Sequence, residues 1–318
     1  MSAIRVAVVG AGEFGRNHMR VIRQSGSAEL VAVVDTDRAR AADAAAQFEC
    51  QALELPELPG RADAAIVAVP TAAHCAVGCA LLEAGLDVLV EKPIAPDLAS
   101  ARQLIQTARA NSRVLQVGHL ERFNPAVAAL RSITGLPLFF EVHRMSVFTP
   151  RSLDIDVVLD LMIHDLDIVL SLVGQMPEEV RGAGISILSR KVDIANVRLA
   201  FPSGCVANLT ASRVSTERVR KLRLFQPRQY VSVDYARQEC AVFEVADNRQ
   251  IAFRLLPVEK AEPLRLELKS FFETVETRRT PVVSGEDACR ALEAASAILD
   301  KIEEHSRRIE HSVAAWKS

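Results

Sequence analysis

A glycine-rich turn near the start of the chain constrains the fold more than any other feature. The run before it, residues 4–9, is almost wholly apolar, which is typical of a strand buried on both faces of a parallel sheet. Gly10, Gly12 and Gly15 then follow in the order G-x-G-x-x-G, which permits a tight turn, admits a pyrophosphate and lets helix and strand touch. A helical pattern and a second apolar run lead to Asp35, a carboxylate that can accept from ribose hydroxyls. This register predicts a dinucleotide-binding domain.

The residues around Asp35 bear on the choice of dinucleotide. Its negative charge would repel a 2′-phosphate, so NAD is expected and NADP is disfavoured. Arg38 and Arg40 follow closely, and they could hold such a phosphate, stack on adenine or simply be solvated.

Length and composition bound the remaining possibilities. At 318 residues the chain suits two domains rather than one core. Its 38 Lys and Arg balance 40 Asp and Glu, so no net field attracts nucleic acid or an anionic membrane. Six scattered cysteines include Cys75 and Cys79 on one helix face, but no second pair completes a zinc site, so we expect no metal. No apolar signal core precedes the first strand, and a reduced, cytoplasmic setting is expected.

The order of expected elements divides the chain near residue 120. Strands and helices alternate over 1–120, which indicates a doubly wound parallel sheet with its ligands at the carboxyl edge. Over 121–318 strands dominate, short turns join them, and a large, mostly antiparallel sheet is expected. We therefore predict an α/β fold of two α/β domains. The elements expected in the second are strands at 138–147, 179–188, 194–201, 205–214, 222–224 and 230–235, and helices at 264–278 and 285–305.

A helix expected over residues 156–173 carries an unusual pattern. It is apolar nearly all round, yet Asp160, His164, Asp167 and Ser171 form one narrow polar stripe. Because buried polar groups need partners, the stripe either pairs internally or lines a wet cavity.

Several motifs together resemble the glucose-fructose oxidoreductase and inositol dehydrogenase family. They are the glycine turn, the tripeptide Glu91-Lys92-Pro93, the stretch 122–125 and the D-x-x-x-H pattern of Asp160 and His164. The resemblance spans almost the whole chain. It implies an N-terminal Rossmann domain over 1–120 and a substrate-binding and oligomerisation domain over 121–318, whose open sheet commonly joins dimers or tetramers. It also implies a cis Lys92-Pro93 bond, which proline makes accessible.

The chemistry of alcohol oxidation agrees with the roles that the resemblance implies. A hydride must leave carbon for the nicotinamide while a base removes the hydroxyl proton. Lys92, at the carboxyl end of a sheet strand, and His164 are both candidate bases. Asp160 would orient the sugar hydroxyl or the imidazole, and the sequence leaves the choice of base open.

The resemblance assigns further residues to each ligand. The residues expected at the cofactor are Gly10, Gly12, Glu13, Phe14, Gly15, Asp35, Thr36, Arg38, Pro70, Thr71, His74, Glu91 and Lys92. The residues expected at the substrate are His119, Glu121, Arg122 and Asn124, for which ordinary salt bridges in a segment joining the domains are the alternative.

Two stretches, 118–125 and 151–156, look most like one branch of this family. That branch oxidises the 3-hydroxyl of UDP-N-acetylglucosamine to a ketone, which a separate aminotransferase converts to an amine for lipid A precursors. Met162 and residues 154–156 stand where many members have glycine, so we expect a pocket shaped differently from those of the inositol and glucose enzymes. The alternatives are a dehydrogenase of a free cyclitol or aldose and a non-catalytic NAD-binding regulator.

Overall fold

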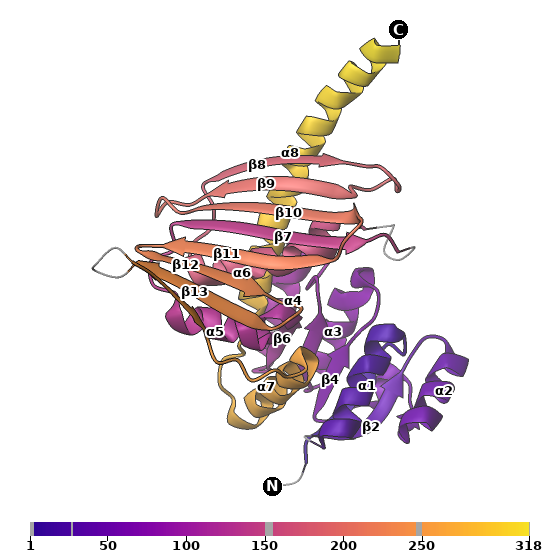
Figure 1. Ribbon diagram of the computed structural model, residues 1–318. Helices are drawn as coiled ribbons and strands as arrows, with labels where there is room; N and C mark the ends of the chain where they lie inside the picture. The colour runs from indigo at the N-terminus through magenta and orange to yellow at the C-terminus, as the bar shows by residue number, and fades with distance from the viewer. Residues whose placement is uncertain (1–2, 27, 150–154, 246–249, 318) are drawn as a thin grey trace. The chain divides into compact units, whose positions relative to one another are not determined.

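Two compact units make up the protein, of which Figure 1 shows a computed structural model. The structure describes residues 3–26, 28–149, 155–245 and 250–317, and its side chains as far as residue 309. Most of the 151–156 stretch therefore lies outside the described residues. The first unit combines 1–123 with 261–289, and the second combines 124–260 with 290–318. This division differs from the predicted one because a late helical segment belongs to the first unit.

The first unit is built on a six-stranded parallel sheet in the order β3-β2-β1-β4-β5-β6. Strand β4 is buried along its whole length and β1 nearly so, as the unbroken apolar runs predicted. The prediction of a doubly wound parallel sheet is confirmed. The elements are β1 (Arg5–Val9), α1 (Glu13–Ser25), β2 (Glu29–Val34), α2 (Arg38–Phe48), β3 (Gln51–Ala52), η1 (Leu55–Glu57), β4 (Ala64–Val67), η2 (Thr71–Ala73), α3 (His74–Glu83), β5 (Asp87–Glu91), α4 (Leu98–Ala110), β6 (Leu115–Gly118), η3 (Leu120–Phe123) and α7 (Pro263–Thr277).

Helix α7 joins the first unit through apolar packing and an ion pair to a buried carboxylate. Leu268 and Phe271 are fully buried in the same core cluster as the strand β1 and helix α1. Just after the helix, Arg278 contacts Asp87 at 2.7 Å, and that carboxylate is 1% exposed. Asp87 also accepts the main-chain N–H of Val114 at 2.8 Å. The segment is thus fastened to the starts of two sheet strands.

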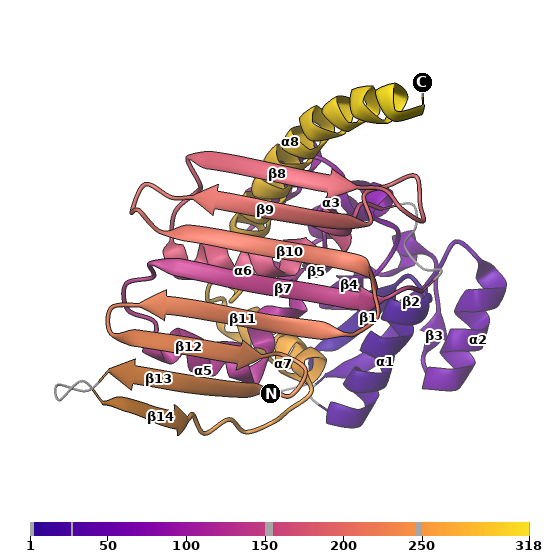
Figure 2. The same ribbon diagram turned by 45° about the horizontal axis from the view of Figure 1, so that its top comes forward.

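The second unit is built on an eight-stranded sheet in the order β14-β13-β12-β11-β7-β10-β9-β8, drawn nearly face-on in Figure 2. Its pairings are antiparallel except that of β7 with β10, as the prediction of a mostly antiparallel sheet required. The elements are α5 (Pro125–Ile133), β7 (Phe139–Val147), η4 (Val158–Met162), α6 (Ile163–Val173), β8 (Glu179–Ile185), β9 (Ile194–Ala200), β10 (Val206–Ser215), β11 (Val219–Gln226), β12 (Gln229–Asp234), β13 (Glu239–Val245), β14 (Ile251–Leu255) and α8 (Gly285–Lys317), whose first turn belongs to the first unit.

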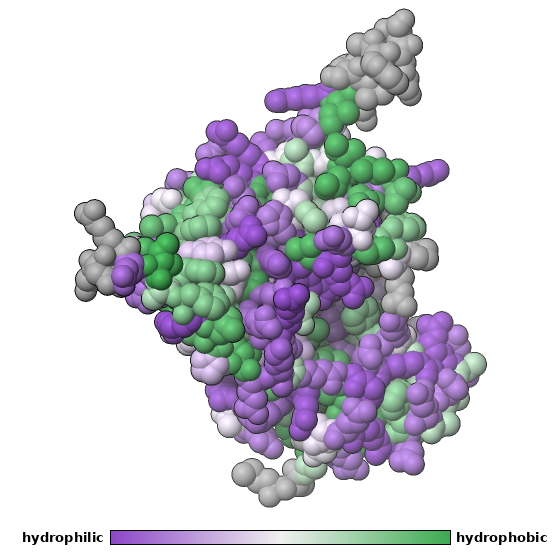
Figure 3. Space-filling model, viewed as in Figure 1, coloured by the Kyte–Doolittle hydropathy of each residue, from purple (hydrophilic) through white to green (hydrophobic). Residues whose placement is uncertain are grey.

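One face of this sheet is covered by α5, α6 and α8, and alternate strand residues make the core beneath them (Figure 2). The other face carries a row of rings that crosses five strands, with neighbouring centroids 4.8 to 5.6 Å apart. The rings belong to Phe139, Phe225, Tyr230, Phe243 and Phe253. Figure 3 shows apolar side chains gathered over β13 and β14 beside the grey residues. This face is uncovered in the described structure.

Three elements of the second unit were missed by the sequence prediction. Helix α5 begins at Asn124-Pro125, where the Asn124 carboxamide accepts the N–H of Ala126 and proline occupies the first turn. Strands β13 and β14 complete the sheet edge, and β14 is exposed at every residue, so it lacks the alternation that marks a half-buried strand.

Within the described residues, each helix is too short or too polar to traverse a lipid bilayer.

Candidate functional site

The three glycines of the first turn have three separate steric roles. Gly10 has φ +104°, and a Cβ built there would lie 2.3 Å from the carbonyl oxygen of Ala68. A Cβ on Gly15 would lie 1.8 Å from the carbonyl oxygen of Gly10. A Cβ on Gly12 meets nothing within 4 Å, so the backbone there faces open space. This is the cradle that a pyrophosphate needs at the N-terminus of α1, and the residues therefore fit a dinucleotide.

Asp35 ends β2 and is tied to the glycine turn. Its Oδ2 accepts the N–H of Ala11 at 2.8 Å, and its Oδ1 accepts the N–H of Asp37 at 2.9 Å. Arg40 lies 3.8 Å from the same carboxylate, whereas Arg38 turns to Glu54 at 3.1 Å. The carboxylate stands at the edge where an adenine ribose would lie, and Arg40 rather than Arg38 is the arginine beside it.

The other residues predicted at the cofactor lie along the same edge of the sheet. Phe14 is 64% exposed, and Glu13, Thr36 and Pro70 are also exposed, whereas Thr71 is half-buried. His74 is only 1% exposed, and its two ring nitrogens lie 2.9 Å from the carbonyl oxygens of Pro93 and Val69. His74 thus joins the end of β4 to the segment after β5. Its contact with the cofactor stays a prediction.

Strand β5 delivers Glu91 and Lys92 at its carboxyl end, and the expected cis Lys92-Pro93 bond is present. Glu91 Oε1 lies 2.7 Å from Nε2 of the buried His18, and its Oε2 accepts the N–H of Lys92 at 3.3 Å. Burial opposes ionisation of Glu91, but the hydrogen bond and charge of His18, with the charge of Lys92, hold the pKa of Glu91 below its ordinary value. The side chain of the candidate base Lys92 is half-buried beside this anion.

Glu267 of α7 is a buried acid that the sequence prediction missed. It is 1% exposed, and neither carboxyl oxygen has a hydrogen-bond partner among the described residues. Burial, and then the charge of Glu91, raise the pKa of Glu267 well above its ordinary value. One signal could have revealed it: Glu267 stands four residues before Phe271, on the apolar face of its helix.

The predicted substrate residues are all buried. His119 is 1% exposed, Glu121 8% and Arg122 9%, and all three belong to the first unit. Asn124 belongs to the second unit, where it caps α5 and donates its Nδ2 hydrogen to the carbonyl of Tyr235 at 3.0 Å. The structure thus gives Asn124 a part in the fold, and substrate contacts of all four stay predictions.

The polar stripe of the second unit begins in a π-helical turn. In η4 the N–H of Ile163 donates to the carbonyl of Val158, five residues back, and α6 continues from there. Such turns are frequent at functional sites. Asp160 and His164 are half-buried, whereas Asp167 is 2% exposed. Ser171 donates its hydroxyl to the carbonyl of Ile168 at 2.8 Å.

A second buried acid, Asp165, was also missed by the prediction. Arg144 of β7 grips it with two hydrogen bonds, Nε to Oδ2 at 2.6 Å and a terminal nitrogen to Oδ1 at 2.9 Å. Both side chains are almost fully buried, and the guanidinium also lies 5.2 Å from the ring centre of Tyr235. The pair fixes the helix that carries His164, the residue preceding Asp165 in the chain.

The predicted catalytic residues fall into two groups, Lys92 in the first unit and Asp160 with His164 in the second. Their convergence on one substrate stays a prediction. In the described part of the chain, no three His, Cys, Asp or Glu side chains are grouped so that they could hold a metal ion.

A parallel sheet with a glycine turn, an open backbone cradle and an acid at the end of β2 defines a dinucleotide-binding domain. The comparison with known families agrees. A family model described as an oxidoreductase family with an NAD-binding Rossmann fold matches residues 4–119, and the GFO/IDH/MocA C-terminal domain matches residues 136–230. The chain belongs to the GFO/IDH/MocA family of NAD-binding dehydrogenases. The predictions of the family, of NAD and of a dehydrogenase are confirmed.

Among its relatives is the UDP-N-acetylglucosamine 3-dehydrogenase of Acidithiobacillus ferrooxidans, 34% identical over 97% of this chain and 100% of that protein. A solved structure of that enzyme has a TM-score of 0.91 and covers 96% of this chain and 99% of its own. The scyllo-inositol 2-dehydrogenase (NAD(+)) of Bacillus subtilis is 28% identical over 92% of each chain. The solved structure of an oxidoreductase from Agrobacterium radiobacter in complex with NAD+ has a TM-score of 0.85 at 15% identity, covers 95% of this chain and 97% of its own, and shows the shared fold.

Proposed function

We propose that this protein oxidises the 3-hydroxyl of UDP-N-acetylglucosamine to a ketone, with NAD as the hydride acceptor. The observation that carries the proposal is the 34% identity to a UDP-N-acetylglucosamine 3-dehydrogenase over 97% of this chain. Three chemical groups support it, since Lys92, Asp160 and His164 are together the side chains that alcohol oxidation requires.

The residues of this chain handle the proton of the reaction. NAD, when bound, accepts the hydride that leaves the carbinol carbon. The amine of Lys92 stands at the carboxyl edge of the parallel sheet, where ligands of such sheets bind. It is one candidate for the base that takes the hydroxyl proton, and the half-buried imidazole of His164 is the other. Asp160, one turn before His164, orients the hydroxyl or the imidazole.

The substrate is held by a second set of side chains. His119, Glu121 and Arg122 follow β6 at the same carboxyl edge, and we assign them to the sugar and its diphosphate. Arg122 brings the planar guanidinium that suits a phosphate oxygen pair. Asn124 supports the same segment by capping α5, and its own contact with the substrate belongs to this proposal.

The test is a rate measurement with NAD and UDP-N-acetylglucosamine, following the absorbance of the reduced nicotinamide. Lys92→Met is expected to lower kcat by about 10²- to 10⁴-fold, because the amine handles a proton in the transition state. Lys269→Met, at an exposed lysine of α7, is the matched control and keeps the wild-type rate. His164→Gln distinguishes the base: the residue whose loss removes the pH dependence of kcat is the proton acceptor. The proposed substrate would be overturned if the wild type turned over none of the UDP-sugars tested.

A free cyclitol is the second candidate substrate, because several relatives are named inositol 2-dehydrogenases. An assay panel with unactivated inositols and aldoses beside UDP-sugars separates the two. Turnover of the free polyols alone would support the cyclitol, and faster turnover of UDP-N-acetylglucosamine would support the nucleotide sugar.

We further infer that the enzyme is a cytoplasmic homodimer or homotetramer that pairs through the open face of its larger sheet. The row of aromatic rings and the exposed Ile251, Phe253 and Leu255 on β14 support this inference, since an apolar area of this kind is typical of an interface. Light scattering of the wild type and of Phe225→Glu tests this pairing, and we expect a smaller assembly in the variant.

We also infer that the 3-keto product passes to an aminotransferase of lipid A precursor synthesis.

A further inference from the structure

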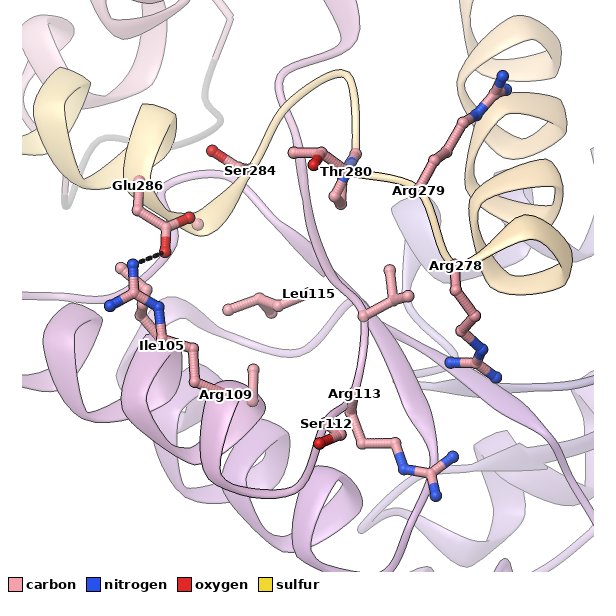
Figure 4. A pocket seen from close by; sticks show the side chains of 14 residues that line it. Ile105, Arg109, Ser112, Arg113, Leu115, Arg278, Arg279, Thr280, Ser284 and Glu286 are labelled. Carbon is pink, nitrogen blue, oxygen red and sulfur yellow. Dashed lines mark hydrogen bonds and ion pairs between the residues drawn. The ribbon is translucent and has the colours of Figure 1, made fainter.

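A pocket of about 290 Å³ lies within the first unit, between the end of α4 and the connection from α7 to α8 (Figure 4). The connection runs along β6, where the N–H of Val117 donates to the carbonyl of Val283 and Gln116 pairs with Ser284. Apolar side chains form part of the pocket wall, among them Ile105, Val114 and Leu115. The pocket is therefore assembled by two segments that are far apart in the sequence.

Four arginines line this pocket, and their partners differ. Arg109 contacts Glu286 at 2.6 Å, and Arg278 contacts the buried Asp87 at 2.7 Å. Arg279 turns away from the pocket in Figure 4 and contacts Glu273 at 2.6 Å.

Arg113 is the exception among them. Its buried Nε has no hydrogen-bond partner in the described part of the chain. Figure 4 shows the guanidinium groups of Arg113 and Arg278 on the same side of the pocket. The first turn of α8, which begins at Gly285 on the wall, carries Glu286 and Asp287, so acids already offset the positive end of this helix. Arg113 is thus the arginine of the pocket for which the described residues supply no acidic partner.

The position of the pocket separates it from the cofactor. Arg113, Val114 and Leu115 lie at the start of β6, whereas the glycine turn and Lys92 lie at the carboxyl ends of their strands. In a parallel sheet these two ends are opposite edges. A ligand in this pocket therefore need not displace the dinucleotide.

We propose that this pocket is a second binding site, which takes a compact phosphate ester. The phosphate lies between Arg113 and Arg278, because guanidinium groups bind phosphate oxygens in a planar, bidentate manner. The body of the ester rests on Ile105 and Leu115. The volume is at the lower limit for ligand pockets, so a ligand of this size is smaller than a dinucleotide or a nucleotide sugar.

The experiment is titration calorimetry of phenyl phosphate into the full-length enzyme saturated with NAD. Phenyl phosphate joins one phosphate to a small apolar body, and inorganic phosphate is the comparison arm. We expect saturable binding of phenyl phosphate, and weaker binding of inorganic phosphate because it cannot use the apolar wall. Arg113→Met weakens phenyl phosphate binding about tenfold or more, the loss expected for a charge-assisted hydrogen bond.

Two further variants guard the interpretation. Arg279→Met is the matched control, because its guanidinium leaves the pocket, and it keeps wild-type affinity. Thr280→Glu adds a negative charge to the wall without touching the ion pairs, and it weakens binding as Arg113→Met does. Four results would each overturn the proposal. Phenyl phosphate could fail to bind the wild type, or it could displace NAD. Its affinity could fall equally in Arg113→Met and Arg279→Met, or it could equal the affinity for inorganic phosphate.

Discussion

Asp165 of the second unit and Glu267 of the first are both removed from water, yet their surroundings are opposite. Asp165 is 2% exposed and receives two hydrogen bonds from a buried arginine. Glu267 is 1% exposed and receives none from the described residues, and the charge of Glu91, which raises the pKa of Glu267, has the same sign as its carboxylate. The first acid has a cation within hydrogen-bond distance, whereas the second is stable only while it keeps its proton.

The difference extends to the candidate catalytic side chains. Asp165 follows His164 in the chain. Glu91 precedes Lys92, and its charge repels that of an ionised Glu267. The helix of His164 is thus held by a buried ion pair. The strand end of Lys92 is held by a cluster of His18, Glu91 and Glu267, in which the pKa of Glu91 is lowered and the pKa of Glu267 is raised. We therefore expect pH to affect the first unit through these two glutamates.

Removing the arginine of the ion pair is expected to have the largest effect. Arg144→Met leaves the Asp165 carboxylate buried without a cation and should lower the free energy of unfolding by about 3–5 kcal/mol. Denaturant unfolding followed by circular dichroism measures this. The double variant Arg144→Met/Asp165→Leu removes both charges and should recover most of the loss, since apolar groups of similar volume often replace a buried pair well. A double variant no more stable than the single one would show that packing around Tyr235, not charge, determines the cost.

Glu267→Gln tests the opposite case, in which the neutral form is the stable one. At pH values between the pKa of the unfolded glutamate and the raised pKa of the folded one, the native state binds one proton more than the unfolded state. Wild-type stability therefore falls as pH rises through this range. The fall is at most about 1.4 kcal/mol per pH unit and is absent below the unfolded pKa. Glutamine cannot ionise, so the variant should gain on the wild type from about pH 5 to about pH 7. Unfolding curves of both proteins over this range give the difference, and parallel pH profiles would contradict the assignment.

The local sequence was sufficient to predict the geometry of the glycine turn and the elements beside it. Each role in the glycine turn depends on residues a few positions apart, and Gly10, Gly12 and Gly15 have the steric surroundings that their spacing predicted. Strands of the parallel sheet were equally predictable, except the short, exposed β3, because burial on both faces leaves an unbroken apolar run. Asp35 follows from the same local register.

The partners of the buried charges could not be predicted, because they are distant in the chain. Arg144 and Asp165 lie on different elements, and a single Asp among apolar helix residues does not reveal its arginine. Glu267 meets Glu91 only because α7 returns to the first unit, which no composition shift announces. The exposed strand β14 was missed for another reason, since pattern-based prediction depends on a buried face.

Asp193 sharpens the comparison as a buried acid satisfied mainly by main-chain donors, with the hydroxyl of Ser189 at 2.7 Å and the buried Arg213 at 3.7 Å beside it. It is fully buried, and its Oδ2 accepts the N–H groups of Ile187, Leu188 and Ser189 at 2.6 to 2.9 Å. Burial opposes ionisation, but these hydrogen bonds lower the pKa of Asp193 to about 2.

Asp193→Asn should therefore cost about 2 kcal/mol at neutral pH, the free energy of that pKa shift. The contribution is present above the unfolded pKa and is lost as pH falls through the folded one, which is the opposite slope to Glu267. Unfolding curves of wild type and variant at neutral and acid pH should converge in acid. A gap that persists there would show that the loss comes from geometry and not from charge.

The smallest effect is expected for Glu273→Gln. This variant applies the same Glu-to-Gln change at a different position of the helix that carries Glu267. Glu273 is 43% exposed, and its carboxylate contacts Arg279 at 2.6 Å and Lys269 at 3.9 Å. Because water already solvates these charges, the variant should lose only about 0.2–1 kcal/mol of unfolding free energy, and the loss should shrink further in high salt. The two glutamines of α7 should therefore shift stability in opposite directions at neutral pH. Glu273→Gln could instead stabilise the protein as much as Glu267→Gln. The gain in unfolding free energy would then come from the lower negative charge of the helix, and burial of Glu267 would not be its cause.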